Sequence, residues 1–128
     1  MGGFIKRDVQ REETTTLTTT INKEVFNTFK DCCKKSGYPL NMVLEIFMRQ
    51  YVDGRFKVDR EDVLKYKDDG VEVSILNTTF NKEICLNFKS TCKTNGYFVK
   101  NVITVFMEKF SNGSVVLEYV NVTENKEE

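Results

Sequence analysis

Histidine and tryptophan are absent from this chain of 128 residues, and proline occurs once. Without histidine, the mixed cysteine and histidine sets that hold zinc cannot form, and the commonest general base of enzymes is missing. The four cysteines show no Cys-x-x-Cys spacing, so we expect reduced thiols packed in the core rather than a metal site. There is no Gly-rich phosphate loop and no plausible pair of nucleophile and base. The sequence therefore predicts a protein that has no cofactor and is not an enzyme.

Long apolar runs are lacking as well. Because no stretch of 18 apolar residues and no charged-then-apolar leader is present, we expect neither a membrane span nor secretion, and predict a cytoplasmic location. Basic and acidic residues number 19 each, so the net charge points to no class of partner. The distribution of charge is more informative, since residues 114–128 carry four acidic groups and one basic group. An acidic tail thus masks a mildly basic body.

Residues 13–54 and 72–113 are two copies of one passage, aligned without gaps at an offset of 59, with 17 identities in 42 positions. Two copies are too few for a solenoid, which needs three or more units. About 40 residues are also too few to enclose a core alone. We therefore expect two halves that complete one another within a single domain.

Each copy changes its hydrophobic period in the same order. Residues 14–22 are β-branched and alternating, as in a strand with one buried face, and residues 75–80 repeat the alternation. Asn22 and Asn81 follow, where a side-chain oxygen caps a helix. Apolar residues at helical spacing then lead to Gly37 and Gly96, which supply left-handed stops. A second amphipathic helix is predicted from about residue 39 to 51, and its twin from about 99 to 110.

The predicted fold is mainly helical, with one two-stranded antiparallel β-ribbon formed by one strand from each copy. Pairing of the strands satisfies their backbone groups and gives a floor on which four helices pack. The predicted parts are an N-terminal arm (1–13), unit 1 (14–54), a linker (55–70), unit 2 (71–113) and an acidic tail (114–128).

The order strand, Asn-Lys-Glu cap, helix, Gly-Tyr, helix resembles the ribbon-helix-helix (MetJ/Arc-type) superfamily, and it does so twice. Unit 1 is most similar to the RelB/DinJ antitoxin branch in the register of residues 38–48. Covalent tandem units resemble the arrangement in TraY-type conjugation proteins. The resemblance implies an intramolecular pseudo-dimer that binds double-stranded DNA, as a transcriptional regulator or as an accessory protein of conjugation or plasmid DNA processing.

In that family the outward side chains of the ribbon touch base edges in the major groove. Carried over to this chain, the base-contacting residues are Thr16, Thr18, Thr20, Ile75, Asn77 and Thr79. Asn can bond to adenine, Thr can offer a hydroxyl or a methyl group, and Ile can meet only apolar groups such as the thymine methyl. Five of the six depart from the Arg, Lys, Asn or Gln common at such places. A threonine-rich face is equally typical of any solvent-exposed strand.

The resemblance also implies that the start of each second helix holds a DNA phosphate. The residues concerned are Leu40 and Asn41 in unit 1, and Val99 and Lys100 in unit 2. Lys100 adds a positive charge that Asn41 lacks, so the two ends are predicted to contribute unequally. The predicted phosphate contacts of the N-terminal arm are Lys6, Arg7 and Arg11, although the arm is equally consistent with an ordinary solvated tail.

Unlike halves need not read a palindrome, so we expect an asymmetric subsite. One ribbon contacts few base pairs, which predicts self-association of a second chain on an adjacent subsite. The alternative is an antitoxin-like protein-binding module, in which the acidic, β-leaning tail grips a partner such as a toxin or a relaxosome protein. The tail is also consistent with a strand packed on the body.

Overall fold

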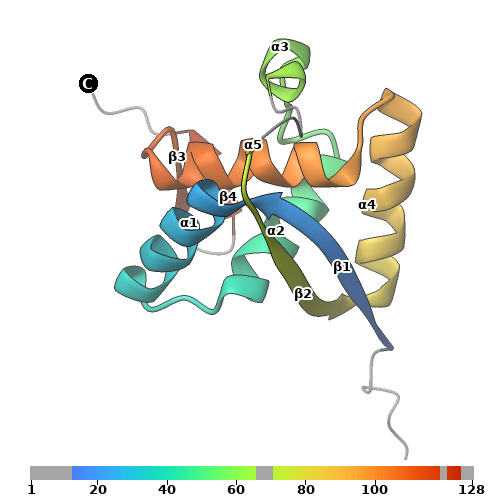
Figure 1. Ribbon diagram of the computed structural model, residues 1–128. Coiled ribbons are helices and arrows are strands. Elements are labelled where there is room, and N and C mark those ends of the chain that lie inside the picture. The colour runs from blue at the N-terminus through green and yellow to red at the C-terminus, as the bar shows by residue number, and fades with distance from the viewer. Residues whose placement is uncertain (1–12, 66–70, 119–120, 125–128) are drawn as a thin grey trace, which may run out of the picture.

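The computed structural model describes residues 13–65, 71–118 and 121–124. Its elements are β1 (Thr14–Asn22), α1 (Lys23–Ser36), α2 (Leu40–Val52), α3 (Arg60–Leu64), β2 (Val73–Asn81), α4 (Lys82–Asn95), α5 (Val99–Ser111), β3 (Val115–Glu118) and β4 (Asn121–Glu124). β1 and β2 form an antiparallel ribbon, and β3 and β4 form a separate hairpin. The prediction of a mainly helical fold with a two-stranded antiparallel ribbon is confirmed (Figure 1).

The two strand-to-helix junctions form as their sequence predicts. The Asn22 side chain accepts a hydrogen bond of 3.0 Å from the Val25 backbone N–H, and Asn81 accepts one of 3.0 Å from Ile84. Each cap satisfies a backbone donor that has no partner inside its helix. Gly37 and Gly96 end the helices with φ of 80° and 82°, a conformation that favours glycine. These local signals begin and end the first helix at equivalent positions in both units.

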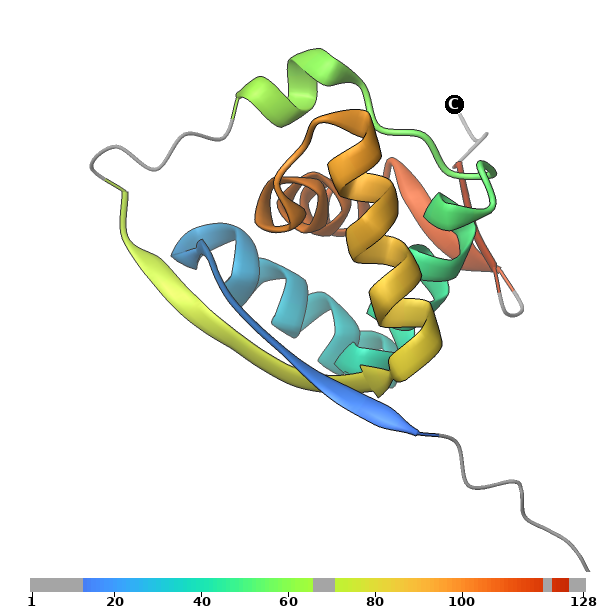
Figure 2. The ribbon, with the colours of Figure 1, turned by 90° about the vertical axis from the view of Figure 1, so that its right-hand side faces the viewer.

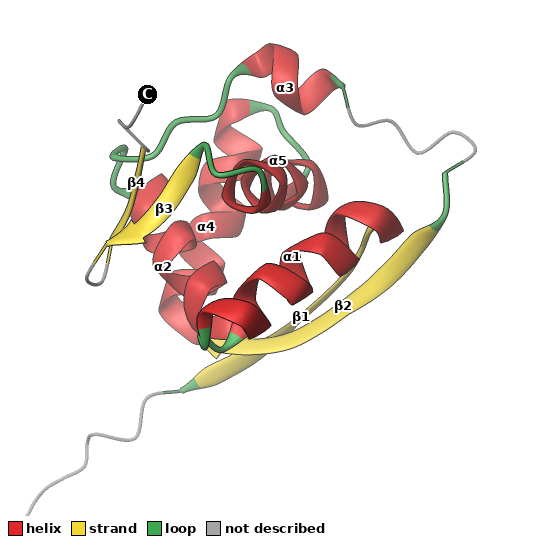
Figure 3. Ribbon diagram, turned by 90° about the vertical axis from the view of Figure 1, so that its left-hand side faces the viewer, coloured by secondary structure: helices red, strands yellow, loops and turns green. Residues whose placement is uncertain are grey.

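The ribbon separates the core from solvent. Its inner face buries Leu17 and Ile21 from β1 and Leu76 and Phe80 from β2. All the helices lie over this inner face, and the opposite face of the ribbon carries none of the described elements (Figures 2 and 3). The alternation of buried and exposed positions along both strands follows from the period of two in a β-strand.

The helices of the two units are interleaved. α1 packs against α5, and α4 packs against α2, so each first helix contacts the second helix of the other unit. Phe47 and Phe106, which stand 59 residues apart, stack at the centre with ring centroids 4.3 Å apart and planes 10° apart. Phe29 meets Phe106 edge-on at 6.0 Å, and its counterpart Phe88 meets Phe47 at 5.7 Å. One continuous core therefore serves both copies of the repeat.

The segments that follow α2 and α5 differ in structure. After α2 the chain buries Phe56 beside the stacked rings and forms α3, which packs on α5. Asp62 of α3 lies 3.6 Å from the Lys109 ammonium group on α5. After α5 the chain buries Val115, the counterpart of Phe56, and forms the hairpin, whose β4 strand packs on α2. Within the described residues, the two C-terminal strands are therefore held against the body, as in one of the two alternatives that the sequence left open.

Candidate functional site

The outer face of the ribbon brings the six predicted base-contacting residues together. In the antiparallel register they are three opposed pairs: Thr16 with Thr79, Thr18 with Asn77, and Thr20 with Ile75. All six alternate along their strands with the buried residues of the inner face; five are exposed, and Thr20 is partly buried. None of the six carries a charge. The ribbon thus presents a continuous, neutral row of small and medium side chains.

The register is centred on the middle pair. Thr18 stands opposite Asn77, and these two residues are also counterparts in the repeat, 59 positions apart. The Thr18 hydroxyl donates a hydrogen bond of 3.2 Å to the Asn77 side-chain oxygen. This bond fixes the orientation of the amide and uses one lone pair of its oxygen. The two N–H donors of the amide are on its nitrogen and take no part in this bond. The Asn77 side chain is therefore an oriented polar group at the centre of the outer face.

The two flanking pairs differ in chemistry. The Thr16 and Thr79 hydroxyl oxygens lie 3.4 Å apart, within hydrogen-bonding distance. At the other flank, Ile75 stands opposite Thr20 with 67% of its surface exposed, and Val73 beyond it is 45% exposed. Ile75 was predicted from the sequence to contact bases and Val73 was not, although the same strand alternation places Val73 on the outer face.

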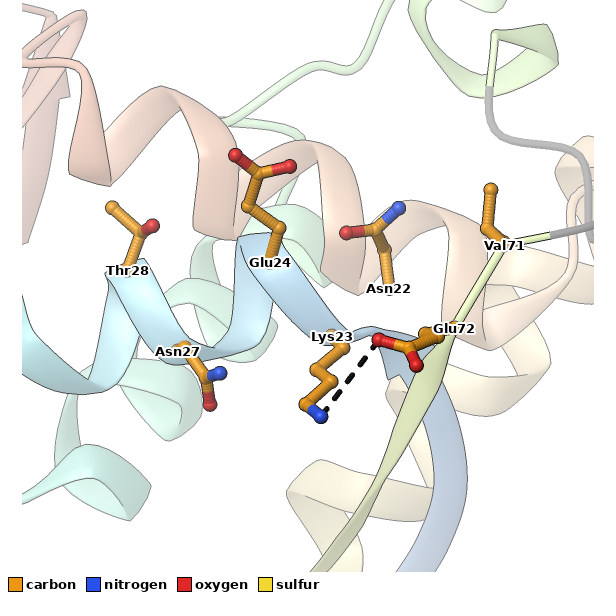
Figure 4. A pocket seen from close by; sticks show the side chains of 7 residues that line it. All are labelled: Asn22, Lys23, Glu24, Asn27, Thr28, Val71 and Glu72. Atoms are coloured by element: carbon orange, nitrogen blue, oxygen red, sulfur yellow. Dashed lines mark ion pairs between the residues drawn. The ribbon is translucent and has the colours of Figure 1, made fainter.

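At each end of the ribbon, a lysine that follows one strand contacts a glutamate that precedes the other strand. The Lys23 backbone N–H donates to the Glu72 carbonyl at 2.9 Å, and Lys82 donates to Glu13 at 2.9 Å. Their side chains form ion pairs of 3.8 Å and 3.5 Å. At one end Lys23 and Glu72 point toward each other beside a hollow that Asn22, Glu24, Asn27, Thr28 and Val71 also line (Figure 4). Sequence reasoning did not include these lysines, although the repeated Asn-Lys-Glu signature marks both.

The predicted phosphate-binding residues lie at the starts of α2 and α5. Neither helix has a side-chain cap at its N-terminus in the described structure. Leu40 and Val99 are partly buried against the core, Asn41 is exposed, and Lys100 is partly buried. The α1–α2 and α4–α5 turns that precede these helices lie on opposite flanks of the ribbon (Figure 1). The two helix starts are therefore brought to either side of the same structure, as phosphate contacts across one groove require.

Lys6, Arg7 and Arg11 of the predicted basic arm lie outside the described residues.

The cysteines are free thiols, and three of the four are buried. Burial raises the pKa of Cys33 to about 11, with a smaller contribution from neighbouring Cys32, and raises that of Cys92 to about 12. A thiol with such a pKa stays protonated at neutral pH and is a poor nucleophile or metal ligand. Among the described residues, no group of three or more His, Cys, Asp and Glu side chains is placed to hold a metal ion.

Comparison with protein family models, curated protein sequences and solved structures finds no match for this chain. In the described part of the chain, no helix has both the length and the apolar character needed to cross a bilayer.

Proposed function

We propose that this protein binds double-stranded DNA by laying the β1–β2 ribbon in the major groove. The single observation that carries the proposal is the outer face of the ribbon, where three opposed pairs of hydrogen-bonding or methyl-bearing residues alternate with the buried residues of the two strands. A two-stranded ribbon is one of the elements that the major groove admits. Thr and Asn can bond to base edges there, and Ile can contact a thymine methyl.

The helix starts support the same proposal. α2 and α5 begin on opposite flanks of the ribbon without a side-chain cap, so their N-terminal dipoles are available to phosphates on the two backbones that border a groove. Phosphate contacts position a protein on DNA, whereas base contacts specify the sequence. In this arrangement the ribbon reads bases and the helix starts fix its depth and register.

The fold proposed for the whole is a tandem ribbon-helix-helix pseudo-dimer within one polypeptide. Supporting it, contacts recur between counterparts: Lys23 with Glu72 and Lys82 with Glu13 at the ribbon ends, and Phe47 with Phe106 at the centre. The register places Thr18 opposite its own counterpart Asn77, as an approximate two-fold axis through the ribbon demands. The protein acts as a transcriptional regulator or as an accessory factor in DNA processing.

The predicted base contacts form only three residue pairs of the outer face, so one chain contacts few base pairs. We propose that a second chain occupies an adjacent subsite, about one helical turn away, to reach useful specificity. Footprinting together with binding stoichiometry tests this directly. Full affinity from one chain on a short isolated site would contradict it.

The alternative, a protein-binding module that grips a partner through its tail, has less support. The hairpin that contains β3 and β4 packs against α2 and α5 of its own chain. That placement occupies the segment which the alternative requires to be free for a partner.

Binding to duplex DNA at several salt concentrations tests the proposed function. The basic residues predicted to contact phosphates are Lys6, Arg7, Arg11 and Lys100. These four predict a slope of about −4 when the logarithm of the association constant is plotted against that of salt concentration. Asn77→Ala removes the central polar reader and is expected to weaken specific binding by about tenfold or more. Thr94→Ala, at an exposed position near the end of α4, is the control and leaves affinity unchanged. Equal effects of the two substitutions, or binding that ignores salt, would refute the proposal.

A further inference from the structure

The outer face of the ribbon is apolar at one end and polar at the other. At the start of β2, Val73 and Ile75 expose 45% and 67% of their surfaces. Their counterparts in the repeat are Thr14 and Thr16, which are exposed at the opposite end. The two ends thus occupy equivalent positions in the fold and differ in chemistry.

Packing among the residues that the structure describes does not account for the apolar end. The core side of β2 is supplied by Leu76 and Phe80, each 1% exposed, and Ile75 faces the other way. Its cross-strand partner is Thr20, a small polar residue that covers little of it. An isoleucine exposed in the middle of a strand therefore adds nothing to the core, while its counterpart position shows that threonine is compatible with the same backbone.

The major groove contains one apolar group that a side chain can read, the thymine 5-methyl. A valine and an isoleucine two residues apart on one strand lie on the same face and can contact methyl groups of neighbouring base pairs. Threonine hydroxyls at the other end can bond to the donors and acceptors of any base pair.

We propose that the ribbon binds an asymmetric DNA site in one orientation, with thymine methyl groups against Ile75 and Val73 and a more polar sequence against Thr16 and Thr79. This inference rests on the proposed function and adds the chemical identity of one half of the site. Because α3 follows α2 and the hairpin follows α5, a fixed orientation on DNA also fixes the direction in which these two unlike segments face along the duplex.

The experiment begins with selection of binding sites from a library of random duplex DNA by the full-length protein. Deoxyuridine then replaces thymidine in one half of the selected site at a time, which removes the 5-methyl group and leaves base pairing unchanged. Loss of a buried methyl contact is expected to weaken binding about fourfold per methyl group, in one half of the site only. Ile75→Thr is expected to abolish most of this sensitivity, and this substitution lies at an exposed position that the core does not use.

The repeat offers a matched control, because residues 16 and 75 are counterparts. The double variant Thr16→Ile, Ile75→Thr moves the apolar side chain to the other end of the ribbon. Because thymine methyl groups set the orientation, the double variant should bind the selected site in reverse. The half of the site that is sensitive to deoxyuridine then stays the same, and DNA cleavage directed from an iron chelate attached to α3 moves to the other side of the site.

Three results would overturn the inference. Equal sensitivity in both halves, or in neither, with salt-dependent DNA binding intact, would refute the orientation and leave the proposed function standing. Absence of binding to any duplex would refute the proposed function and the inference with it. A DNA-free dimer that Ile75→Thr converts to a monomer would assign the apolar end to contact between copies of the chain instead.

Discussion

Replacement of Phe47 by alanine should destabilise both units of the protein at once. The Phe47 side chain is fully buried, stacks on Phe106 at 4.3 Å and contacts Phe88 and Phe56 edge-on. Truncation of a buried phenylalanine to alanine costs about 3–5 kcal/mol. Because Phe47 belongs to one unit and Phe88 and Phe106 to the other, the cavity opens at the point where the two copies meet.

The size of the effect follows from the length of the chain. The unfolding entropy of a 128-residue protein corresponds to a change in Tm of about 4 °C for each kcal/mol. Phe47→Ala is thus expected to lower Tm by about 12–20 °C, in a single transition that circular dichroism and tyrosine fluorescence report together. Phe106→Ala, its counterpart, should give a loss of similar size.

Two further variants make the test decisive. Phe98→Ala removes a phenylalanine that is 72% exposed and should change stability by no more than about 0.5 kcal/mol. Phe47→Leu leaves a smaller cavity and should give a smaller shift, so the series remains measurable if the alanine variant is unfolded. Two separate transitions in Phe47→Ala, one of them at the original Tm, would refute the view that the units share one core.

Other predictions concern the caps and the thiols. Asn22→Ala and Asn81→Ala each remove a cap bond of 3.0 Å and should each cost about 1 kcal/mol in urea denaturation, additively because the caps lie at opposite ends of the ribbon; strong coupling between them would contradict this. The raised pKa values of Cys33 and Cys92 mean that the folded state binds these protons more tightly than the unfolded state does. Under reducing conditions the contribution of these thiols to the free energy of unfolding should therefore be constant below about pH 9. It should then fall by up to about 1.4 kcal/mol per pH unit for each thiol, from about pH 9 to 11 for Cys33 and from about pH 9 to 12 for Cys92, a loss that Cys92→Ala should reduce.

The elements of the repeat were predictable because each depends on residues a few positions apart. The alternation in β1, the cap at Asn22 and the stop at Gly37 are local signals, and the structure contains all three. The antiparallel ribbon was predictable for a different reason: a lone strand with one buried face leaves its backbone groups unpaired, and the second copy supplies the only equivalent partner.

The segments after the second helices could not be predicted in the same way. α3 has only five residues, so its helical pattern in the sequence is weak. It is held by contacts distant in sequence, including the ion pair of Asp62 with Lys109. Phe56 appears in the sequence as an isolated apolar residue, and Val115 as the first of three consecutive apolar residues in the tail. Their burial depends on the space beside the stacked rings, which no local pattern encodes.

The placement of the predicted base-contacting residues on one face was predictable, and their pairing across the ribbon was not. Strand alternation placed six side chains on one face, and all six are found there. The bond from Thr18 to Asn77 depends on the cross-strand register, which the sequence left open, and so does the grouping of Val73 with Ile75 at one end.

Both strands of the ribbon belong to one polypeptide, so the amount of intact ribbon depends on protein concentration differently than in a dimer of separate chains. A ribbon assembled from two separate chains falls apart on dilution, so its amount grows with the square of the chain concentration when chains are scarce. Here β1 and β2 stay together at any concentration, since the chain between them joins them covalently. The amount of intact ribbon therefore rises in direct proportion to the number of molecules, and even a few copies per cell carry a complete one.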